Sequence, residues 1–227
     1  MNHIESEQEF LTYLKLFDGV PLGKRTDIVV CDASFNDYLT ATYLRDKRNI
    51  TRIYNITLKN VKTLDGIISV PVQGSIVHTI QRVKFDMLIS LGGTYYFQPI
   101  HEVVHALHKS LNLAGRLFLA VYPSVYDEYG KDILNGLSLI SKNPVNERLQ
   151  RWFATLKNSF CSIFIDVKTE EILQATSVGE VKSIFGSDNF FKFLFKNSDD
   201  FEDFFRPIEN ANKRYTLSWR IIKALKI

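Results

Sequence analysis

The stretch DIVVCDASFNDYLTATYL, residues 27–44, determines how the chain is interpreted. It begins with the β-branched apolar run IVVC, which suits a strand buried on both faces of a parallel sheet. Polar residues come next, and then a segment with helical spacing, so the stretch predicts a strand, a turn and a helix. In many α/β enzymes such a turn is rich in glycine and holds a nucleotide-like cofactor. Here the turn has no glycine, which leaves two interpretations: an unusual cofactor site, or one that has been lost.

The composition is that of an ordinary globular protein. The 227 residues are 45% hydrophobic and 23% charged, which is enough to bury the core of one domain. A net charge of +3 does not indicate nucleic-acid binding without a localised basic patch. The N-terminus, MNHIESEQEF, lacks the basic and apolar regions of a signal peptide, and no apolar run has membrane-spanning length. We therefore expect a cytoplasmic protein that does not enter a membrane.

The two cysteines, Cys31 and Cys161, both lie in runs that read as apolar strands. Such positions favour reduced thiols in the core of a cytosolic protein over a disulfide or a metal site. No metal is therefore expected at either cysteine.

Short apolar runs alternate with helical patterns along most of the chain. The runs that read as strands are TRIYNI, GIISVPV, FDMLIS, GRLFLAVY and CSIFIDV, which start at residues 51, 66, 85, 115 and 161. The clearest helical pattern is the apolar stripe of QPIHEVVHALHKSLNL, residues 98–113. Near the N-terminus, Ser6 and Glu9 form a capping box for a helix over residues 7–17. The alternation predicts a single α/β domain with a mostly parallel sheet.

The C-terminal third has a different character. Residues 169–208 read as short helices, and the stretch from Phe185 to Phe205 holds eight of the 17 phenylalanines. The run KRYTLSWRIIKAL, residues 213–225, then alternates as a long strand does. We therefore expect one domain over residues 1–227, in which residues 169–208 form a helical insertion or lid before an antiparallel last strand.

A family resemblance is carried by the middle of the chain. In KFDMLISLGGTYYFQPIHEVVHALHKSLNLAGRLFLAVY, residues 84–122, an FD pair opens a strand, and a helix then leads through the turn SLNLAGR into the next strand. This order resembles the centre of class I S-adenosylmethionine (SAM) dependent methyltransferases, with Ala114 where the first glycine of the family's turn usually stands. The segment IDVKTEEILQATSVGEV, residues 165–181, is similar to the segment after strand six in trans-aconitate-like and malonyl-carrier-protein methyltransferases. The resemblance implies a Rossmann-like fold and SAM as the cofactor.

The resemblance also implies a set of cofactor residues, several of them atypical. The acidic residue after the first strand is Asp32, but the glycine positions of the family's loop carry side chains, including that of Tyr38. Such side chains intrude where the backbone would approach the cofactor. Asn55 replaces the family's acidic partner of the ribose hydroxyls, and Gln73 replaces its aspartate near adenine. The implied cofactor residues are Asp32, Ala33, Ser34, Asn36, Asn55, Gln73, Ser90, Leu91 and Gly92.

The loop GGTYYF, residues 92–97, comes directly after an expected strand. It should therefore lie at the carboxyl edge of the sheet, where α/β proteins place ligands. In the family this loop faces both cofactor and substrate, so Gly93, Tyr95 and Tyr96 are the candidate substrate residues. The alternative is a turn whose tyrosines close the edge of the core.

A second motif competes with this interpretation. HEVVH, residues 101–105, matches the zinc-peptidase signature, in which two histidines one helical turn apart bind the ion and the glutamate is the general base. His108 adds a third imidazole, but three ligands at these spacings on one helix do not converge on a tetrahedral ion. We therefore interpret the histidines as flanking the apolar stripe of an ordinary helix, and we expect no bound metal.

Three functions remain open from the sequence. The first is a SAM-dependent methyltransferase for a small or acyl-chain substrate, free or bound to a carrier protein. The second is a pseudo-methyltransferase that has lost SAM and binds a protein partner through the phenylalanine-rich segment 185–205. The third is a zinc peptidase that uses HEVVH. The basic stretch from Arg206 to Ile227 suits an acidic carrier protein or nucleic acid, or protects a solvated strand edge. Because the cofactor loop is atypical, we predict weak SAM binding or none.

Overall fold

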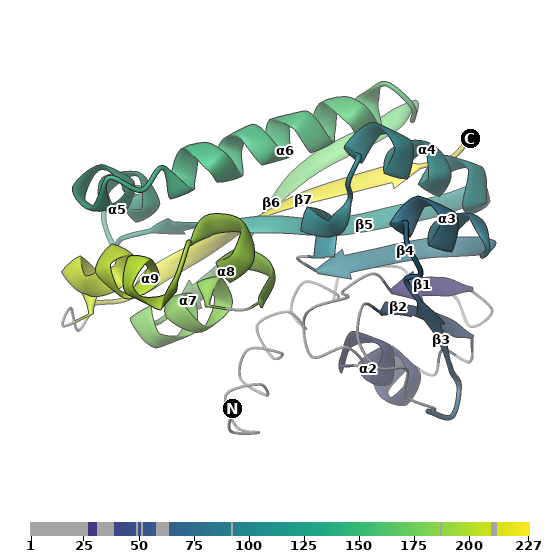
Figure 1. The fold of residues 1–227 in the computed structure, drawn as a ribbon, viewed down its shortest axis with the longest axis horizontal. Coiled ribbons are helices and arrows are strands. Elements are labelled where there is room, and N and C mark those ends of the chain that lie inside the picture. The colour runs from purple at the N-terminus through teal and green to yellow at the C-terminus, as the bar shows by residue number, and fades with distance from the viewer. Residues whose placement is uncertain are drawn as a thin grey trace.

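The computed structural model of the protein describes residues 27–30, 39–48, 50, 52–57, 64–91, 93–186, 188–209 and 213–227. These residues form a seven-stranded sheet with helices packed against it (Figure 1). In chain order the strands are β1 (Ile28–Val30), β2 (Ile53–Thr57), β3 (Ile67–Pro71), β4 (Phe85–Leu91), β5 (Leu111–Tyr126), β6 (Asp166–Thr176) and β7 (Tyr215–Leu225).

The strand order across the sheet is β3-β2-β1-β4-β5-β7-β6. The pairs β1–β2, β1–β4, β2–β3 and β4–β5 are all parallel. β7 runs antiparallel to both of its neighbours, β5 and β6. The predicted fold class, a mostly parallel sheet with an antiparallel last strand, is therefore confirmed.

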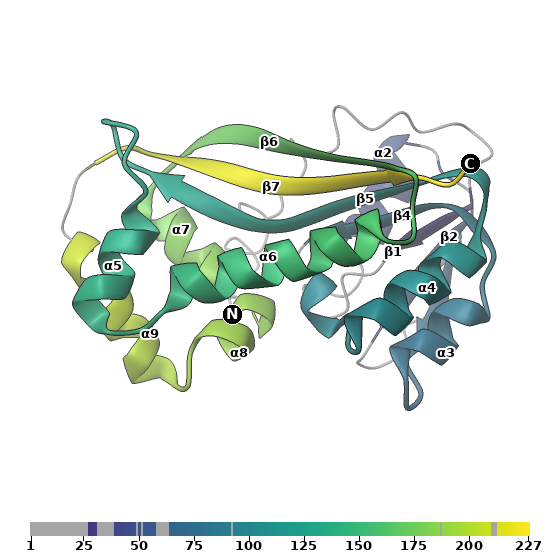
Figure 2. The same ribbon diagram turned by 90° about the horizontal axis from the view of Figure 1, so that it is seen from above.

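Helices cover both faces of the sheet. The helices α3, α4 and α6 lie on one face and α2 lies on the other, while α5 and the segment α7–α9 gather at one end (Figures 1 and 2). Within the part of the chain that the structure describes, no helix is long and apolar enough to cross a membrane. The helices are α2 (Leu39–Arg48), α3 (Ile76–Gln81), η1 (Gly93–Tyr96), α4 (Ile100–Ser110), α5 (Ile133–Ser141), α6 (Val145–Cys161), α7 (Val178–Phe185), α8 (Asp188–Leu194), α9 (Ser198–Phe205) and η2 (Arg206–Ile208).

The core lies between the sheet and its helices. Ile89 on β4 and Leu119 on β5 are fully buried on neighbouring parallel strands, as their apolar runs predict. Cys31, which the same reasoning places on the first strand, lies outside the described residues, as does the expected helix over residues 7–17. On α4 the apolar stripe is buried and includes Val103, Val104 and Leu107.

The first residues of β5, where its register against β4 shifts between Leu111 and Arg116, correspond to the turn of the family resemblance. Ala114, at the position of the family's glycine, has a φ of 59°, in the left-handed region that glycine adopts with less strain. At Gly115 a Cβ atom would lie 2.6 Å from the Leu111 side chain and 2.7 Å from the Asn112 carbonyl oxygen. The turn is held by Lys226, whose Nζ donates to the carbonyl oxygens of His108 and Leu111 at 2.7 Å each.

The prediction of a strand in CSIFIDV is wrong for its first residues. Helix α6 continues to Cys161, a turn comes next, and β6 begins only at Asp166. Cys161 is therefore an exposed thiol at a helix end and not a core thiol on a strand. The run misleads because the buried Phe164 and its apolar neighbours belong to a turn that folds back onto the core.

The boundaries of the helical insertion also require correction. Residues 169–176 belong to β6, so the helical segment begins with α7 at Val178 and ends with η2 at Ile208. The segment 165–181, which the resemblance places after strand six, contains strand six itself and the start of α7. A polar edge strand lacks the continuous apolar run that identifies a buried one, and its Glu, Lys and Gln residues favour a helix.

The last strand lies inside the sheet and not at a solvated edge, because β7 is flanked by β5 and β6. Two of its basic residues are ion-paired to the neighbouring strand: Arg220 pairs with Glu171, and Lys223 lies 2.6 Å from Glu170. Part of the basic charge of the C-terminal segment is thus neutralised within the sheet.

Candidate functional site

The carboxyl edge of the central strands brings several predicted cofactor residues together. Val30, the last described residue of β1, is in register with Asn55 on β2 and with Ile89 on β4. Ser90 and Leu91 continue β4 toward the same edge, and both are buried. Residues from separate parts of the sequence therefore lie on neighbouring strands near the edge where parallel α/β sheets place their ligands.

Asn55 occupies a different place within its strand from the one the sequence suggests. β2 continues through Thr57, so Asn55 lies two residues before the end of the strand, and its side chain is buried. Gln73 lies just beyond β3 and is exposed, and its neighbour Val72 donates its N–H to the Thr57 carbonyl oxygen at 2.9 Å. Asn55 and Gln73 thus come from adjacent strands, and their roles toward ribose and adenine remain predictions.

Five of the implied cofactor residues lie outside the described residues. Their structural placement is therefore not part of the site geometry, and their roles remain predictions. These residues are Asp32, Ala33, Ser34, Asn36 and Gly92.

The loop after β4 forms the short helix η1 and directs Tyr95 into the interior. The Tyr95 hydroxyl donates to the Val121 carbonyl oxygen at 3.1 Å. Its ring contacts Trp152, Phe190 and Phe193, with centroid distances of 5.5, 5.2 and 4.5 Å. Burial raises the pKa of Tyr95 well above its ordinary value, so this hydroxyl stays neutral.

Tyr95 therefore has the position described by the alternative interpretation, in which a tyrosine closes the edge of the core. Gly93 is buried beside it, whereas Tyr96 is only half-buried. The substrate roles of these residues remain predictions, and Tyr96 is the tyrosine of the pair with the more accessible side chain.

The phenylalanine-rich segment packs on itself and on η1. Six of its eight phenylalanines are buried: Phe185, Phe190, Phe195, Phe201, Phe204 and Phe205. The remaining two, Phe191 and Phe193, are partly buried against the same core. The segment is thus buried, as expected for helices that are apolar on all sides. It covers the loop after β4.

A buried polar cluster near this loop was not identified from the sequence. β5 continues past the end of β4, and the side chains of Tyr122 and Ser124 are fully buried there. On β7, Ser218 donates to Glu171 at 2.8 Å, and Glu171 also pairs with Arg220. Burial raises the pKa of Tyr122, and the neighbouring Arg220 opposes that rise. The only signal in the sequence is the presence of polar side chains at alternate positions of otherwise apolar strands.

The HEVVH motif lies on the outer side of α4. His101, Glu102 and His105 are exposed, and the two imidazole rings are 4.7 Å apart between centroids. His108 instead packs edge-to-face on Phe164 at 5.0 Å. Among the residues whose positions the structure describes, no three His, Cys, Asp or Glu side chains are grouped to hold a metal ion.

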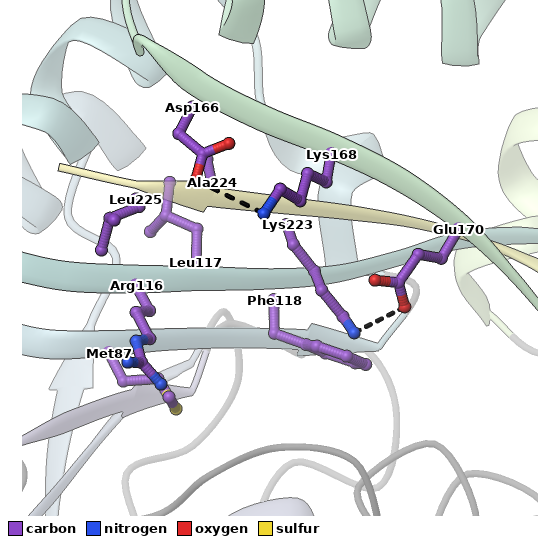
Figure 3. A pocket seen from close by; sticks show the side chains of 10 residues that line it. All are labelled: Met87, Arg116, Leu117, Phe118, Asp166, Lys168, Glu170, Lys223, Ala224 and Leu225. Carbon is purple, nitrogen blue, oxygen red and sulfur yellow. Dashed lines mark hydrogen bonds and ion pairs between the residues drawn. The ribbon is translucent and has the colours of Figure 1, made fainter.

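A pocket of about 360 Å³ lies at the opposite end of the sheet, where β4, β5 and β6 begin and β7 ends (Figure 3). None of the predicted cofactor or substrate residues lines it. Figure 3 shows that its side chains include two ion pairs, Asp166 with Lys168 and Glu170 with Lys223. The lining residues are Met87, Arg116, Leu117, Phe118, Asp166, Lys168, Glu170, Lys223, Ala224 and Leu225.

No family model matches the chain, and no curated protein sequence matches it. Solved structures do match. The geranyl diphosphate C-methyltransferase of Streptomyces coelicolor, solved with S-adenosyl-L-homocysteine, is 11% identical, with a TM-score of 0.52 over 97% of this chain and 80% of that chain. The YcgJ protein of Bacillus subtilis is 9% identical, with a TM-score of 0.51 over 97% of this chain and 98% of that chain.

A longer protein is also similar. The phosphoethanolamine N-methyltransferase 2 of Haemonchus contortus, solved with S-adenosyl-L-methionine, is 10% identical, with a TM-score of 0.51. The match covers 96% of this chain but 52% of that one, so the chain spans about half the length of the Haemonchus enzyme. Together with the strand order, these similarities show that the chain has the class I methyltransferase fold.

Proposed function

We propose that the protein is a SAM-dependent methyltransferase with an atypical cofactor loop. The observation that carries the proposal is the sheet order β3-β2-β1-β4-β5-β7-β6 with β7 antiparallel, because it brings the ends of β1, β2 and β4 to one edge. The SAM-binding proteins among the similar structures support the choice of cofactor. Fold alone does not fix a function, so the chemistry of this edge has to be considered as well.

The described residues at this edge are compatible with SAM. Asn55 and Ser90 supply a buried amide and a buried hydroxyl, which are groups that bind ribose hydroxyls and an amino-acid moiety. Gln73, just beyond the neighbouring strand β3, supplies a second amide on the side expected for adenine. An amide binds a hydroxyl less strongly than a carboxylate does, so we expect weak SAM affinity.

When bound, SAM supplies an electrophilic methyl group. The contribution of the protein would be proximity, orientation and the exclusion of water rather than a dedicated base. In this proposal the loop at Gly93 and Tyr96 positions the acceptor, while the phenylalanine-rich segment covers it. An apolar cover of this kind suits an acyl-chain acceptor, free or on a carrier protein, as in the malonyl-carrier-protein enzymes that the sequence resembles.

Calorimetric titration of the protein with SAM and S-adenosylhomocysteine tests the proposal. We expect dissociation constants about ten- to a hundredfold weaker than micromolar, which corresponds to the loss of one charge-assisted hydrogen bond. Replacing Asn55 by Asp should tighten binding by about tenfold if this side chain faces the ribose. The matched control is Asn158→Asp on the exposed side of α6, which adds the same charge and should leave SAM affinity unchanged.

The second candidate is a pseudo-methyltransferase that keeps the fold for a protein interaction. It is favoured by the same amide at Asn55, because a site under no selection for SAM has no need of the family's carboxylate. No heat of binding at millimolar SAM, for the wild type and for Asn55→Asp alike, would reject the first proposal in favour of this one.

A further inference from the structure

β6 forms one edge of the sheet. Within the described ranges its strand partner is β7 alone, and Figure 2 shows β6 along the outer margin with β7 between it and β5. The strand is 11 residues long, and most of its side chains are exposed or half-buried. A long edge strand offers a row of backbone N–H and C=O groups to another strand, and proteins usually protect such edges.

Two large apolar side chains stand out at the ends of this edge. Ile165, just before β6, is 85% exposed, and Leu173 is 66% exposed. They are separated by an even number of residues, so a pairing that extends one residue beyond the start of β6 would place them on the same face of the sheet. Both side chains are accessible to another chain that pairs along this edge.

We propose that two copies of the chain pair antiparallel through β6, about a two-fold axis at Thr169. In such an isologous contact, residues at equal distances on either side of the axis lie opposite each other. Ile165 then lies opposite Leu173 of the second copy, and Lys168 lies opposite Glu170 of the second copy. Each pair occurs twice, so the interface joins two apolar pairs and two pairs of opposite charge.

The charges favour this register over the two registers next to it. An antiparallel edge contact between identical sheets requires an axis normal to the sheet, so residues that lie opposite each other must come from the same face. The axis then lies midway between one residue of β6 and the same residue of the second copy. An axis at Lys168 would place Lys168 opposite Lys168 of the second copy, and an axis at Glu170 would place Glu170 opposite Glu170. Like charges directly opposite each other are destabilising. Of these three neighbouring positions, only the axis at Thr169 pairs unlike charges.

The two charged side chains are accessible for this contact. Lys168 is 70% exposed and lies 3.8 Å from Asp166, while Glu170 is 45% exposed beside Lys223. Both line the same pocket (Figure 3), as expected for side chains that share a face. A lysine on an edge strand normally deters pairing, but opposite Glu170 its charge is compensated. The pairing would join two seven-stranded sheets into one continuous sheet.

Sedimentation velocity over a series of protein concentrations tests the proposal. We expect the wild type to form dimers of twice the chain mass, and we expect Leu173→Lys and Lys168→Glu each to weaken dimerisation by about tenfold. Exchanging both charges, in Lys168→Glu/Glu170→Lys, should restore most of the loss. The matched control is Leu139→Lys on α5, which changes a side chain that is 74% exposed away from this edge and should leave dimerisation unchanged.

Cross-linking tests the register directly. With Cys161 replaced by Ser, Thr169→Cys should form a disulfide-linked dimer on mild oxidation, because the residue lies opposite itself. Glu171→Cys and the Cys161→Ser parent should not. A chain that is monomeric at all concentrations would overturn the proposal, whether or not the edge binds some other polypeptide. A dimer that neither Leu173→Lys nor Lys168→Glu weakens, and that Thr169→Cys does not cross-link, would overturn it as well.

Discussion

The two halves of the sheet differ in size and in what they carry. β1, β2 and β3 are 3, 5 and 5 residues long, whereas β5, β6 and β7 are 16, 11 and 11. The long half contains Trp219 and Tyr122, two of the largest fully buried side chains. Of the predicted cofactor residues that the structure describes, Asn55 lies on β2 and Gln73 follows β3, both in the short half, whereas Ser90 and Leu91 lie on the neighbouring β4. The comparison indicates that the framework is built in the long half, while the predicted ligand edge reaches into the short half, where local stability is expected to be lower.

The largest expected effect contrasts equivalent truncations in the two halves. Ile221 on β7 and Ile53 on β2 are both fully buried, and replacing a buried isoleucine by alanine costs about 2–5 kcal/mol. We expect Ile221→Ala to fall near the upper end, because two long strands flank it, and Ile53→Ala near the lower end. Urea unfolding of both variants measures the difference. Equal losses would show that the two halves are equally resistant to a cavity.

The turn that opens the long half gives the next effect. Gly115→Ala should destabilise the protein by about 1–3 kcal/mol, because the new methyl group would overlap Leu111 and the Asn112 carbonyl. Ala114→Gly should instead stabilise it by about 0–1 kcal/mol, because glycine adopts the left-handed φ of 59° with less strain. Glycine also raises the conformational entropy of the unfolded chain, which offsets part of this gain. Thermal unfolding of the two variants checks both signs. A destabilised Ala114→Gly would contradict the backbone assignment at this turn.

A smaller effect is expected at the border between the halves. Tyr95→Phe removes the buried hydrogen bond to the Val121 carbonyl and should cost about 0.5–1.5 kcal/mol of folding free energy. If the hydroxyl serves only this bond, the variant retains the SAM affinity of the wild type. Calorimetry and urea unfolding on the same samples separate the two roles, and a changed affinity with unchanged stability would assign Tyr95 to the ligand site.

The smallest effect is a pH dependence from the long half. Burial lowers the pKa of His108, and the nearby Lys226 and His105 lower it further. The unfolded chain therefore binds this proton more readily than the folded one, so the stability contribution is complete above the unfolded pKa and is lost as the pH falls through the lowered value. His108→Gln should reduce the loss of stability between about pH 8 and about pH 5. Urea unfolding at both values measures it, and an identical pH dependence in the variant would exclude His108 as a cause.

The sequence predicts the buried strands well and the edge strand poorly. Apolar runs identify β4 and β5 because both of their faces are covered, and the same rule fails for β6, whose side chains are half in solvent. The helical insertion is recognised from its phenylalanines, but its start is misplaced because the Glu and Lys residues of β6 resemble a helix. Exposure of Cys161 is missed for a different reason, because the apolar run around Phe164 extends the predicted strand back to include it.

The candidate site is predicted in outline and not in detail. The order of strands fixes which segments come to the carboxyl edge, and it brings Asn55 and Ser90 to strands on either side of β1, while their roles toward a cofactor stay predictions. The direction of a side chain depends on partners far along the chain. The acceptor for the Tyr95 hydroxyl lies 26 residues away, and the partner of Ser218 lies 47 residues away. Sequence patterns of short period carry no information about such contacts.

The position of β7 in the sheet has a consequence for biosynthesis. β7 comes after β5 and β6 in the chain but lies between them in the sheet. A ribosome that has translated β6 has made both neighbours without the strand that joins them, so each presents an open edge to solvent. Because strands without partners are templates for aggregation, the interval between translation of β6 and of β7 is the period when the nascent chain most needs a chaperone.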